Sequence, residues 1–305
     1  MLHWRIIIGA GLIALLAALA WLDFHAARPG VYLTPLALVA SLFAADEFVR
    51  LFRNGSQPMA GDATPARWEV VSGAVFVTLA ASIPVLLGLE QVSVGPAVWL
   101  ALALVLAMQI AVLMEMIRYT GPGVSTARLA RTVLGISYVG GLLGFCVQLR
   151  AFGGDDGKWG MVALLSMIAV VKASDTGAYF TGRAIGKHKM TPLLSPGKTW
   201  QGAAGGFGAA VLAAALMLGP MARAMGCASD RGFTLWLAGC IVYALVVGIA
   251  GVVGDLAISL LKRDAQLKDS SAWLPGFGGV LDLLDSILFA APVAYVLWIC
   301  RVVGP

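Results

Sequence analysis

The stretch from residue 254 to residue 286 gathers polar and charged side chains between two long apolar segments. Asp255, Ser259 and Lys262 are spaced i, i+4 and i+7, so in a helix they would share one face. Carboxylates, ammonium groups, hydroxyls and exposed backbone amides are the groups that bind a polyphosphate and its metal ion. The residue types in this stretch therefore predict a site for such a ligand.

Two further carboxylates, Asp282 and Asp285, open the last apolar segment at a spacing of i, i+3. The glycine-rich run Pro275–Gly279 precedes them, and glycine lets a backbone come close to a ligand. Negative charge is favourable at any helix N-terminus, by typically about 0.3–1 kcal/mol. That effect alone accounts for one acidic residue as well as for two, and it leaves Asp255 unexplained.

A second polar stretch covers residues 172–202. Lys172 and Asp175 lie at the end of an apolar segment, where they form either a self-neutralising ion pair or part of a site. The run Ser195–Thr199 (SPGKT) precedes the next apolar segment, and hydroxyls with a lysine beside a helix N-terminus favour phosphate. This run lacks the glycine spacing of a P-loop, and a helix cap by Ser or Thr explains it about as well. Both interpretations stay open.

The chain as a whole is apolar, with 60% hydrophobic and only 12% charged residues, against about 25% charged in soluble domains. Several apolar runs approach the roughly 20 residues that cross a bilayer as a helix, and the alternation of a membrane barrel is absent. The sequence predicts an all-α, polytopic integral membrane protein with about nine transmembrane helices. The expected spans are 5–22, 31–50, 69–90, 96–118, 129–150, 159–182, 202–222, 232–262 and 281–302.

About five of these helices would form an N-terminal region, residues 1–150, and the others a C-terminal catalytic region, residues 151–305. Most lysines and arginines fall on one side of the expected spans, which the positive-inside rule places in the cytoplasm. The N-terminus would then be cytoplasmic, the C-terminus outside, and both polar stretches would face the cytoplasm. The net charge of +5 is modest and does not indicate a nucleic-acid surface. Near the end of the second span, Glu47 and Arg50 are expected to form an interfacial ion pair.

The polar positions of the C-terminal stretch resemble, at every spacing, the signature of the phosphatidate cytidylyltransferases (CDP-diacylglycerol synthases). The matching residues are Ser259, Leu261, Lys262, Arg263, Lys268, Asp269, Ser271, Leu274, Pro275, Gly278, Gly279, Asp282 and Asp285. The runs 175–180 and 195–200 are similar to a second conserved region of that family. The first 150 residues agree with the family only as membrane helices.

The resemblance implies that CTP and phosphatidic acid react to give CDP-diacylglycerol and pyrophosphate, a step of phospholipid biosynthesis. It implies a multi-pass enzyme of the cell (inner) membrane with Mg²⁺ as cofactor, and it leaves room for a second cation. CTP, phosphatidic acid and the lipid bilayer would be its partners; nucleic acid would not, and a homodimer stays open. A lipid phosphate is already ionised at neutral pH, so the reaction needs charge neutralisation more than a strong base.

The resemblance also assigns roles to individual residues. The expected catalytic residues are Asp255, Lys262 and Asp282. The expected metal ligands are Asp255, Asp282 and Asp285. The expected substrate-binding residues are Ser259, Arg263, Lys268, Asp269, Ser195, Lys198, Asp175, Gly278 and Gly279.

Four residues depart from the family pattern. Phe277 stands where the family usually has His, Leu283 where it has Arg, and Gln201 and Ile258 where it has Glu. Loss of an imidazole and a guanidinium is expected to weaken substrate binding more than to change the reaction class. The alternatives are a CTP-dependent polyprenol or lipid kinase, a catalytically weak family member, and a secondary transporter. A transporter would place its charges near the bilayer midplane.

Overall fold

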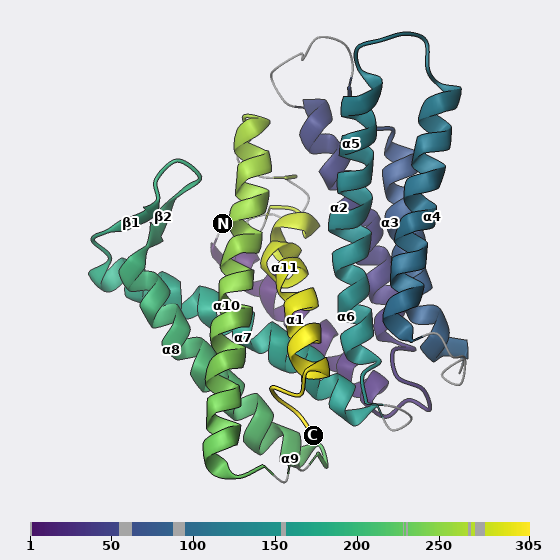
Figure 1. The fold of residues 1–305 in the computed structure, drawn as a ribbon. Helices are drawn as coiled ribbons and strands as arrows, with labels where there is room; N and C mark the ends of the chain where they lie inside the picture. Colours follow the sequence, from purple (N-terminus) through teal and green to yellow (C-terminus); the bar gives the residue numbers. More distant parts are fainter. Residues whose placement is uncertain are drawn as a thin grey trace. The chain divides into compact units, whose positions relative to one another are not determined.

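The computed structural model describes residues 2–54, 63–87, 95–153, 157–227, 229, 231–267, 270–271 and 278–305. Within these residues, nine helical segments follow one another, and each overlaps one of the apolar segments expected from the sequence (Figure 1). They are α1 (Leu2–Phe24), α2 (Leu33–Asn54), α3 (Arg67–Leu87), α4 (Pro96–Ile117), α5 (Ser125–Gly135) continued by η1 (Ile136–Gly141) and α6 (Leu142–Arg150), α7 (Lys158–Ile185), α8 (Trp200–Leu216) continued by η2 (Met217–Met221) and α9 (Ala222–Ala224), α10 (Phe233–Asp264) and α11 (Val280–Ile299).

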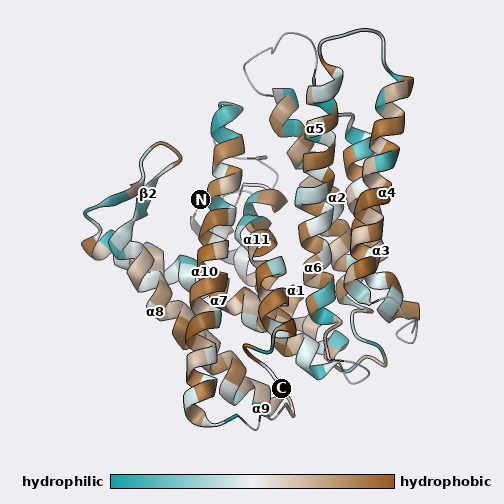
Figure 2. Ribbon diagram, viewed as in Figure 1, coloured by the Kyte–Doolittle hydropathy of each residue, from teal (hydrophilic) through white to brown (hydrophobic). Residues whose placement is uncertain are grey.

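The helical membrane-protein class is confirmed. In the described part of the chain, 6 helical segments are long and apolar enough to cross a membrane. They are Pro96–Ile117, Ser125–Arg150, Lys158–Ile185, Trp200–Ala224, Phe233–Asp264 and Val280–Ile299. Figure 2 shows α4 and α10 hydrophobic along most of their length, as helices surrounded by lipid are. The larger number of about nine transmembrane helices stays a prediction.

The described residues group into two compact units, and the first unit contains Met1–Ala151 and Leu261–Leu284. In this unit, α3 packs against α2, α4 and the π-helical η1. A Cβ atom at Gly140 in η1 would lie 2.6 Å from the carbonyl oxygen of Ala74, so the two helices meet backbone to backbone. The buried guanidinium of Arg150 pairs with Asp23, with Nε 2.5 Å from Oδ2, and this pair ties the end of α1 to the end of α6.

The second unit contains Phe152–Leu260 and Asp285–Pro305. Helices α7 and α8 pack closely here because small residues line the contact: a Cβ atom at Gly206 would lie 2.7 Å from the carbonyl oxygen of Ser174. The hydroxyl of the buried Tyr243 in α10 lies 3.0 Å from that of Ser166 in α7. Trp298 of α11 donates its indole N–H to the same hydroxyl at 3.5 Å. These polar contacts tie three helices of the unit together.

One element departs from the all-α expectation. Between α7 and α8 the chain forms an antiparallel hairpin of β1 (Lys189–Thr191) and β2 (Ser195–Thr199), visible beside α8 in Figure 1. The strands pair Lys189 with Thr199 and Thr191 with Ser195. Threonine at the paired positions favours extended backbone. Strands this short contain too few alternating apolar and polar residues to be predicted from the sequence.

Candidate functional site

The end of α10 and the start of α11 contribute to a polar group in the first unit. We call the Asp282 cluster the group Glu47, Lys262, Ser270, Ser271, Gly279 and Asp282. The Lys262 ammonium lies 2.8 Å from Asp282 Oδ1. Asp282 Oδ2 accepts hydrogen bonds from the Ser270 N–H at 2.9 Å, the Ser270 hydroxyl at 3.0 Å and the Gly279 N–H at 3.2 Å. Both carboxylate oxygens of Asp282 are therefore engaged by the protein itself.

The buried carboxylate of Glu47 caps the start of α11. It accepts the N–H groups of Val280 at 3.0 Å and Leu281 at 2.8 Å. It also accepts the Ser271 hydroxyl at 3.0 Å, and its Oε2 lies 3.1 Å from the Ser270 hydroxyl, whose single proton is shared between Glu47 and Asp282. The first N–H groups of a helix have no partner inside the helix, and a carboxylate there also interacts favourably with the helix dipole. Sequence reasoning missed this role, since the residues that Glu47 binds lie more than two hundred positions away.

The expected ion pair between Glu47 and Arg50 is wrong. Arg50 Nη2 instead lies 2.6 Å from Asp46 Oδ2, one turn earlier in α2. Arg67 also contacts Asp46. The i, i+4 spacing of Asp46 and Arg50 suits a surface pair, and it leaves Glu47 to face the interior of the unit.

Two glycines are required where the chain enters α11. Gly278 has a φ of +82°, a left-handed conformation that favours glycine. A Cβ atom at Gly279 would lie 2.1 Å from Glu47 Oε2 and 2.2 Å from the Ser270 hydroxyl oxygen. In this structure the backbone at these glycines comes close to the protein's own polar side chains, and its expected approach to a ligand stays a prediction.

A second polar group lies within the second unit. We call the Asp255 cluster the group Lys172, Asp175, Lys198, Asp255, Asp285 and Ser286, which come from α7, β2, α10 and α11. Lys198 Nζ lies 2.7 Å from Asp255 Oδ2 and donates to the carbonyl oxygen of Val252 at 3.2 Å. Lys172 Nζ donates to the Ser286 hydroxyl at 3.1 Å and lies 3.8 Å from Asp175 Oδ2. The two polar stretches of the sequence thus meet in this cluster.

A close helix contact brings the carboxylates of this cluster together. A Cβ atom at Gly254 in α10 would lie 2.4 Å from the carbonyl oxygen of Asp285 in α11. This contact places Asp285 of α11 beside the turn of α10 that carries Asp255. Three carboxylates face two ammonium groups, which leaves an excess negative charge able to attract a cation.

The SPGKT run forms β2, and its last residue, Thr199, is the N-cap of α8. The Thr199 side chain accepts the N–H of Gly202 at 3.1 Å, which is the capping interaction left open by the sequence. The Lys198 side chain pairs with the carboxylate of Asp255 in α10. Ser195 lies in β2, where its carbonyl oxygen accepts the Thr191 hydroxyl at 3.5 Å. The run therefore combines a helix cap with one lysine of the Asp255 cluster.

The other predicted residues fall in different surroundings. Ser259 is buried in α10, and the exposed Arg263 donates to the carbonyl oxygen of Leu267 at 3.5 Å. Among the departures from the family pattern, Ile258 is fully buried and Leu283 is half-buried. Lys268, Asp269 and Phe277 lie outside the described residues.

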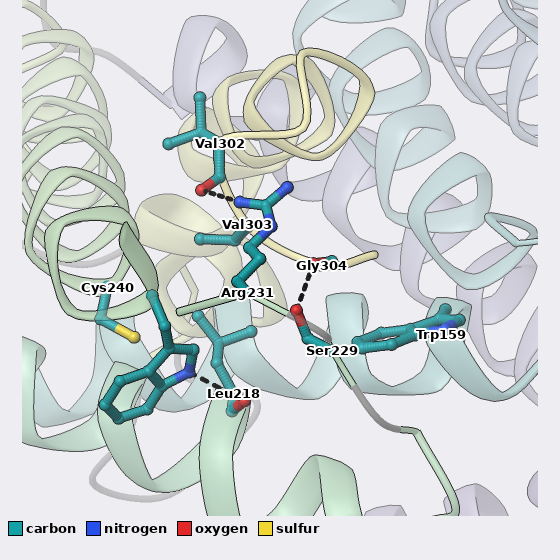
Figure 3. Close-up of a pocket in the computed structure, with 9 residues that line it drawn as sticks. Trp159, Leu218, Ser229, Arg231, Cys240, Val302, Val303 and Gly304 are labelled. Atoms are coloured by element: carbon teal, nitrogen blue, oxygen red, sulfur yellow. Dashed lines mark hydrogen bonds between the residues drawn. The ribbon is translucent and has the colours of Figure 1, made fainter. Parts of the chain in front are cut away.

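Two cavities of the structure are separate from both clusters. The cavity in Figure 3 has a volume of about 10 Å³, enough for at most one water molecule. Arg231 and Ser229 there donate to the carbonyl oxygens of Val302 and Gly304, at 2.8 and 3.3 Å. In the first unit, a groove of about 160 Å³ is lined mostly by apolar residues of α3 and α4. Neither cavity is lined by a predicted site residue.

The fold and the clusters define a helical, multi-span membrane protein with groups suited to phosphate chemistry. The sequence model of the cytidylyltransferase family matches residues 3–300. The chain belongs to this family, as the resemblance of its polar motifs predicted.

Individual relatives match about half of the chain. A phosphatidate cytidylyltransferase of Haemophilus influenzae is 41% identical over 133 residues, 44% of this chain and 44% of the relative. The protein of that name from Brucella suis is 42% identical over 149 residues, 49% of this chain and 51% of the relative. An uncharacterised protein of Escherichia coli is 37% identical over 136 residues, 45% of this chain and 42% of the relative. The chain spans about half the length of the curated relatives it matches.

Proposed function

We propose that this chain transfers the cytidylyl group of CTP to phosphatidic acid, giving CDP-diacylglycerol and pyrophosphate. A phosphate oxygen of the lipid attacks the α-phosphorus of CTP, and the bond to the β-phosphate breaks with its electrons leaving on pyrophosphate. Family membership and the names of the relatives support this reaction. The structural observation that carries it is the Asp255 cluster, where Lys198 of the hairpin meets lysine and carboxylate side chains of helices able to cross a membrane.

The donor chemistry of the Asp255 cluster fits Mg²⁺. Hard carboxylate oxygens suit this ion, which proteins usually bind through one or two carboxylates together with substrate phosphates and water. In the described part of the chain, no three His, Cys, Asp or Glu side chains gather closely enough to hold a metal by themselves. Asp255 and Asp285 would therefore share the ion with CTP. Bound there, Mg²⁺ would supply neutralisation of phosphate charge.

The lysines would act on the two anionic substrates. Lys198 and Lys172 would bind phosphate oxygens, and Asp255 and Asp175 hold these ammonium groups in place until substrate enters. Lys262 and Asp282 would hold the start of α11, because the Lys262 ammonium pairs with the Asp282 carboxylate, which also accepts the N–H of Gly279. A direct contact of Lys262 with phosphate, and of Asp282 with a metal, stay predictions that the substrate-bound enzyme would have to meet.

The proposed setting is the cell (inner) membrane. Six apolar helical segments among the described residues support a multi-pass protein. The distribution of lysine and arginine supports a cytoplasmic N-terminus and an external C-terminus, with CTP arriving from the cytoplasm.

The test uses the purified full chain in lipid nanodiscs with phosphatidic acid, Mg²⁺ and CTP labelled at either the α- or the γ-phosphorus. We expect the α-label in the lipid fraction and one pyrophosphate released for each labelled lipid. Chelation of Mg²⁺ should abolish the reaction, and added Mg²⁺ should restore it. The γ-label in lipid, with release of CDP, would identify a lipid kinase instead. No label in lipid from either CTP, in a folded protein, would overturn the proposal.

A further inference from the structure

The β1–β2 hairpin ends in an apolar tip whose central residue is almost fully exposed. The connection between the strands is Pro192, Leu193 and Leu194, and the Leu193 side chain is 90% exposed. An isolated two-stranded hairpin is at best marginally stable in water, and a leucine gains nothing by facing water. The exposed leucine therefore indicates that the tip contacts something other than water in the working protein.

The surroundings of this tip are basic. Residues 176–229 include no Asp or Glu. Lys187 and Lys189 are exposed at the base of the hairpin, and Arg183 is exposed at the end of α7. A surface that combines exposed basic side chains with an apolar tip is complementary to anionic lipid headgroups above acyl chains.

Aromatic residues indicate that this end of the unit lies at a membrane interface. Tyr179 and Phe180, near the end of α7, and Trp200, at the start of α8, all have exposed rings. Helices α7 and α8 both belong to segments long and apolar enough to cross a membrane. Tyrosine and tryptophan gather at headgroup level in such helices. The hairpin joins the two helix ends that carry these rings.

The base of the hairpin is held firmly, so its tip has a defined direction. The Gln201 side chain accepts the N–H groups of Lys187 at 3.2 Å and His188 at 3.1 Å. Its amide nitrogen lies 2.7 Å from His188 Nδ1. The Trp200 N–H donates to the carbonyl oxygen of His188 at 3.0 Å. These bonds fix the hairpin to the first turn of α8 and present Leu193 away from it.

We propose that the β1–β2 hairpin binds the surface of the bilayer in which the protein sits, with Lys187 and Lys189 on anionic phospholipid headgroups and Leu193 inserted between them. The contact is independent of the reaction proposed above. The combination of net positive charge, an apolar tip and neighbouring aromatic rings favours a lipid surface over a protein partner.

The test places a spin label at the tip of the hairpin in the full chain. The background carries Cys146→Ser and Cys300→Ser, which remove the two free cysteines that are not buried. Leu193→Cys is labelled in nanodiscs of phosphatidylcholine alone or mixed with an equal amount of phosphatidylglycerol. Collision with oxygen reports lipid contact, and collision with a water-soluble nickel chelate reports water contact. Gly197→Cys on β2 is the reference, because a side chain there meets open space.

We expect the label at position 193 to be open to oxygen and shielded from nickel in the anionic bilayer, and more so than the label at position 197. Lys187→Gln and Lys189→Gln should each lower the ratio of shielded to water-exposed label about fivefold. Arg223→Gln, a matched change of an exposed arginine in α9, should leave the ratio unchanged. Nickel contact in both bilayers would overturn the proposal. Shielding that ignores lipid charge, or shielding from both reagents as in a protein contact, would overturn it as well.

Discussion

The Asp282 cluster and the Asp255 cluster contain the same kinds of groups but differ in how far the protein satisfies them. The side chains of Lys262 and Asp282 are 13% and 10% exposed, and both Asp282 oxygens accept hydrogen bonds from the protein. In the Asp255 cluster, Asp285 is buried and Lys198 pairs closely with Asp255, but the side chains of Lys172 and Asp175 are each 41% exposed, with a long ion-pair distance of 3.8 Å. Groups that are buried and fully paired stabilise a fold, whereas open groups retain capacity for a ligand.

This difference separates two roles that the sequence could not distinguish. Asp255, Asp282 and Asp285 were all predicted as metal ligands from the resemblance to the phosphatidate cytidylyltransferases. Both carboxylate oxygens of Asp282 already have partners in the protein, including the N–H of Gly279 just before α11. Asp285 belongs to the Asp255 cluster, which contains two further carboxylates. Repulsion between carboxylates is relieved by a cation, so the Asp255 cluster is the better candidate for a metal and for phosphate.

The largest expected effect is that of Asp255→Asn. Asparagine keeps the size of the side chain and removes the charge that would hold Mg²⁺ and orient Lys198. Loss of such an electrostatic contribution should lower the rate of lipid labelling by about 10²–10³-fold. The unfolding temperature should stay unchanged, because the side chain is partly exposed. A normal rate at limiting Mg²⁺ would contradict the assignment of this cluster to catalysis.

The next prediction concerns stability in the Asp282 cluster. Lys262→Ala and Asp282→Asn each remove a charge-assisted hydrogen bond, worth about 1.5–3 kcal/mol in unfolding free energy. If Lys262 and Asp282 stabilise the protein mainly through their contact with each other, the double variant should lose clearly less unfolding free energy than the sum of the two single variants. Unfolding of the four proteins in one detergent measures this coupling.

Kinetics on the same four proteins sharpen the comparison. A Lys262→Ala variant of normal stability but low rate, with no coupling to Asp282→Asn, would show that Lys262 binds substrate. That result would support the role predicted from sequence and would remove the distinction between the two clusters.

Much of the fold could be predicted because it depends on local composition. Long apolar runs decide where the helices lie, and each expected segment overlaps a helix among the described residues. The β1–β2 hairpin escaped prediction because its strands, Lys189–Thr191 and Ser195–Thr199, are too short for a periodic pattern. The i, i+4 and i+7 spacing of Asp255, Ser259 and Lys262 is kept in the continuous α10.

The partners of the site residues could not be predicted to the same extent. Glu47 caps α11 through residues far along the chain, and no local pattern marks such a contact. Arg50 pairs with Asp46 and not with Glu47, because the Glu47 side chain faces the interior of the unit. Residue types indicate which charged groups are candidates for a site. Burial and pairing, which follow from tertiary packing, show which of these groups already bind other parts of the protein.

A smaller effect is expected from Gly279→Ala. The added methyl group would lie within 2.1–2.2 Å of Glu47 Oε2 and the Ser270 hydroxyl oxygen, so the cap of α11 has to shift. Crowding of this kind typically costs about 1–3 kcal/mol of unfolding free energy. Gly197→Ala is the matched control, since a methyl group there meets nothing within 4 Å. Equal unfolding temperatures of the two variants would show that the Asp282 cluster is less tightly packed than described.

The smallest effect is expected at the SPGKT run, where neighbouring residues have opposite roles. Thr199→Ala removes the cap of α8 and should lower the unfolding free energy by about 1 kcal/mol, with KM for CTP and phosphatidic acid unchanged. Lys198→Ala, its control one residue earlier, should raise KM for one substrate, because its ammonium is proposed to bind phosphate, and should also lower stability through loss of its contacts with Asp255 and the Val252 carbonyl oxygen. Steady-state kinetics and unfolding of both variants measure this contrast. If Thr199→Ala raised KM as strongly as Lys198→Ala, the threonine hydroxyl would bind phosphate, and the run would act as a unit on substrate instead of dividing between cap and site.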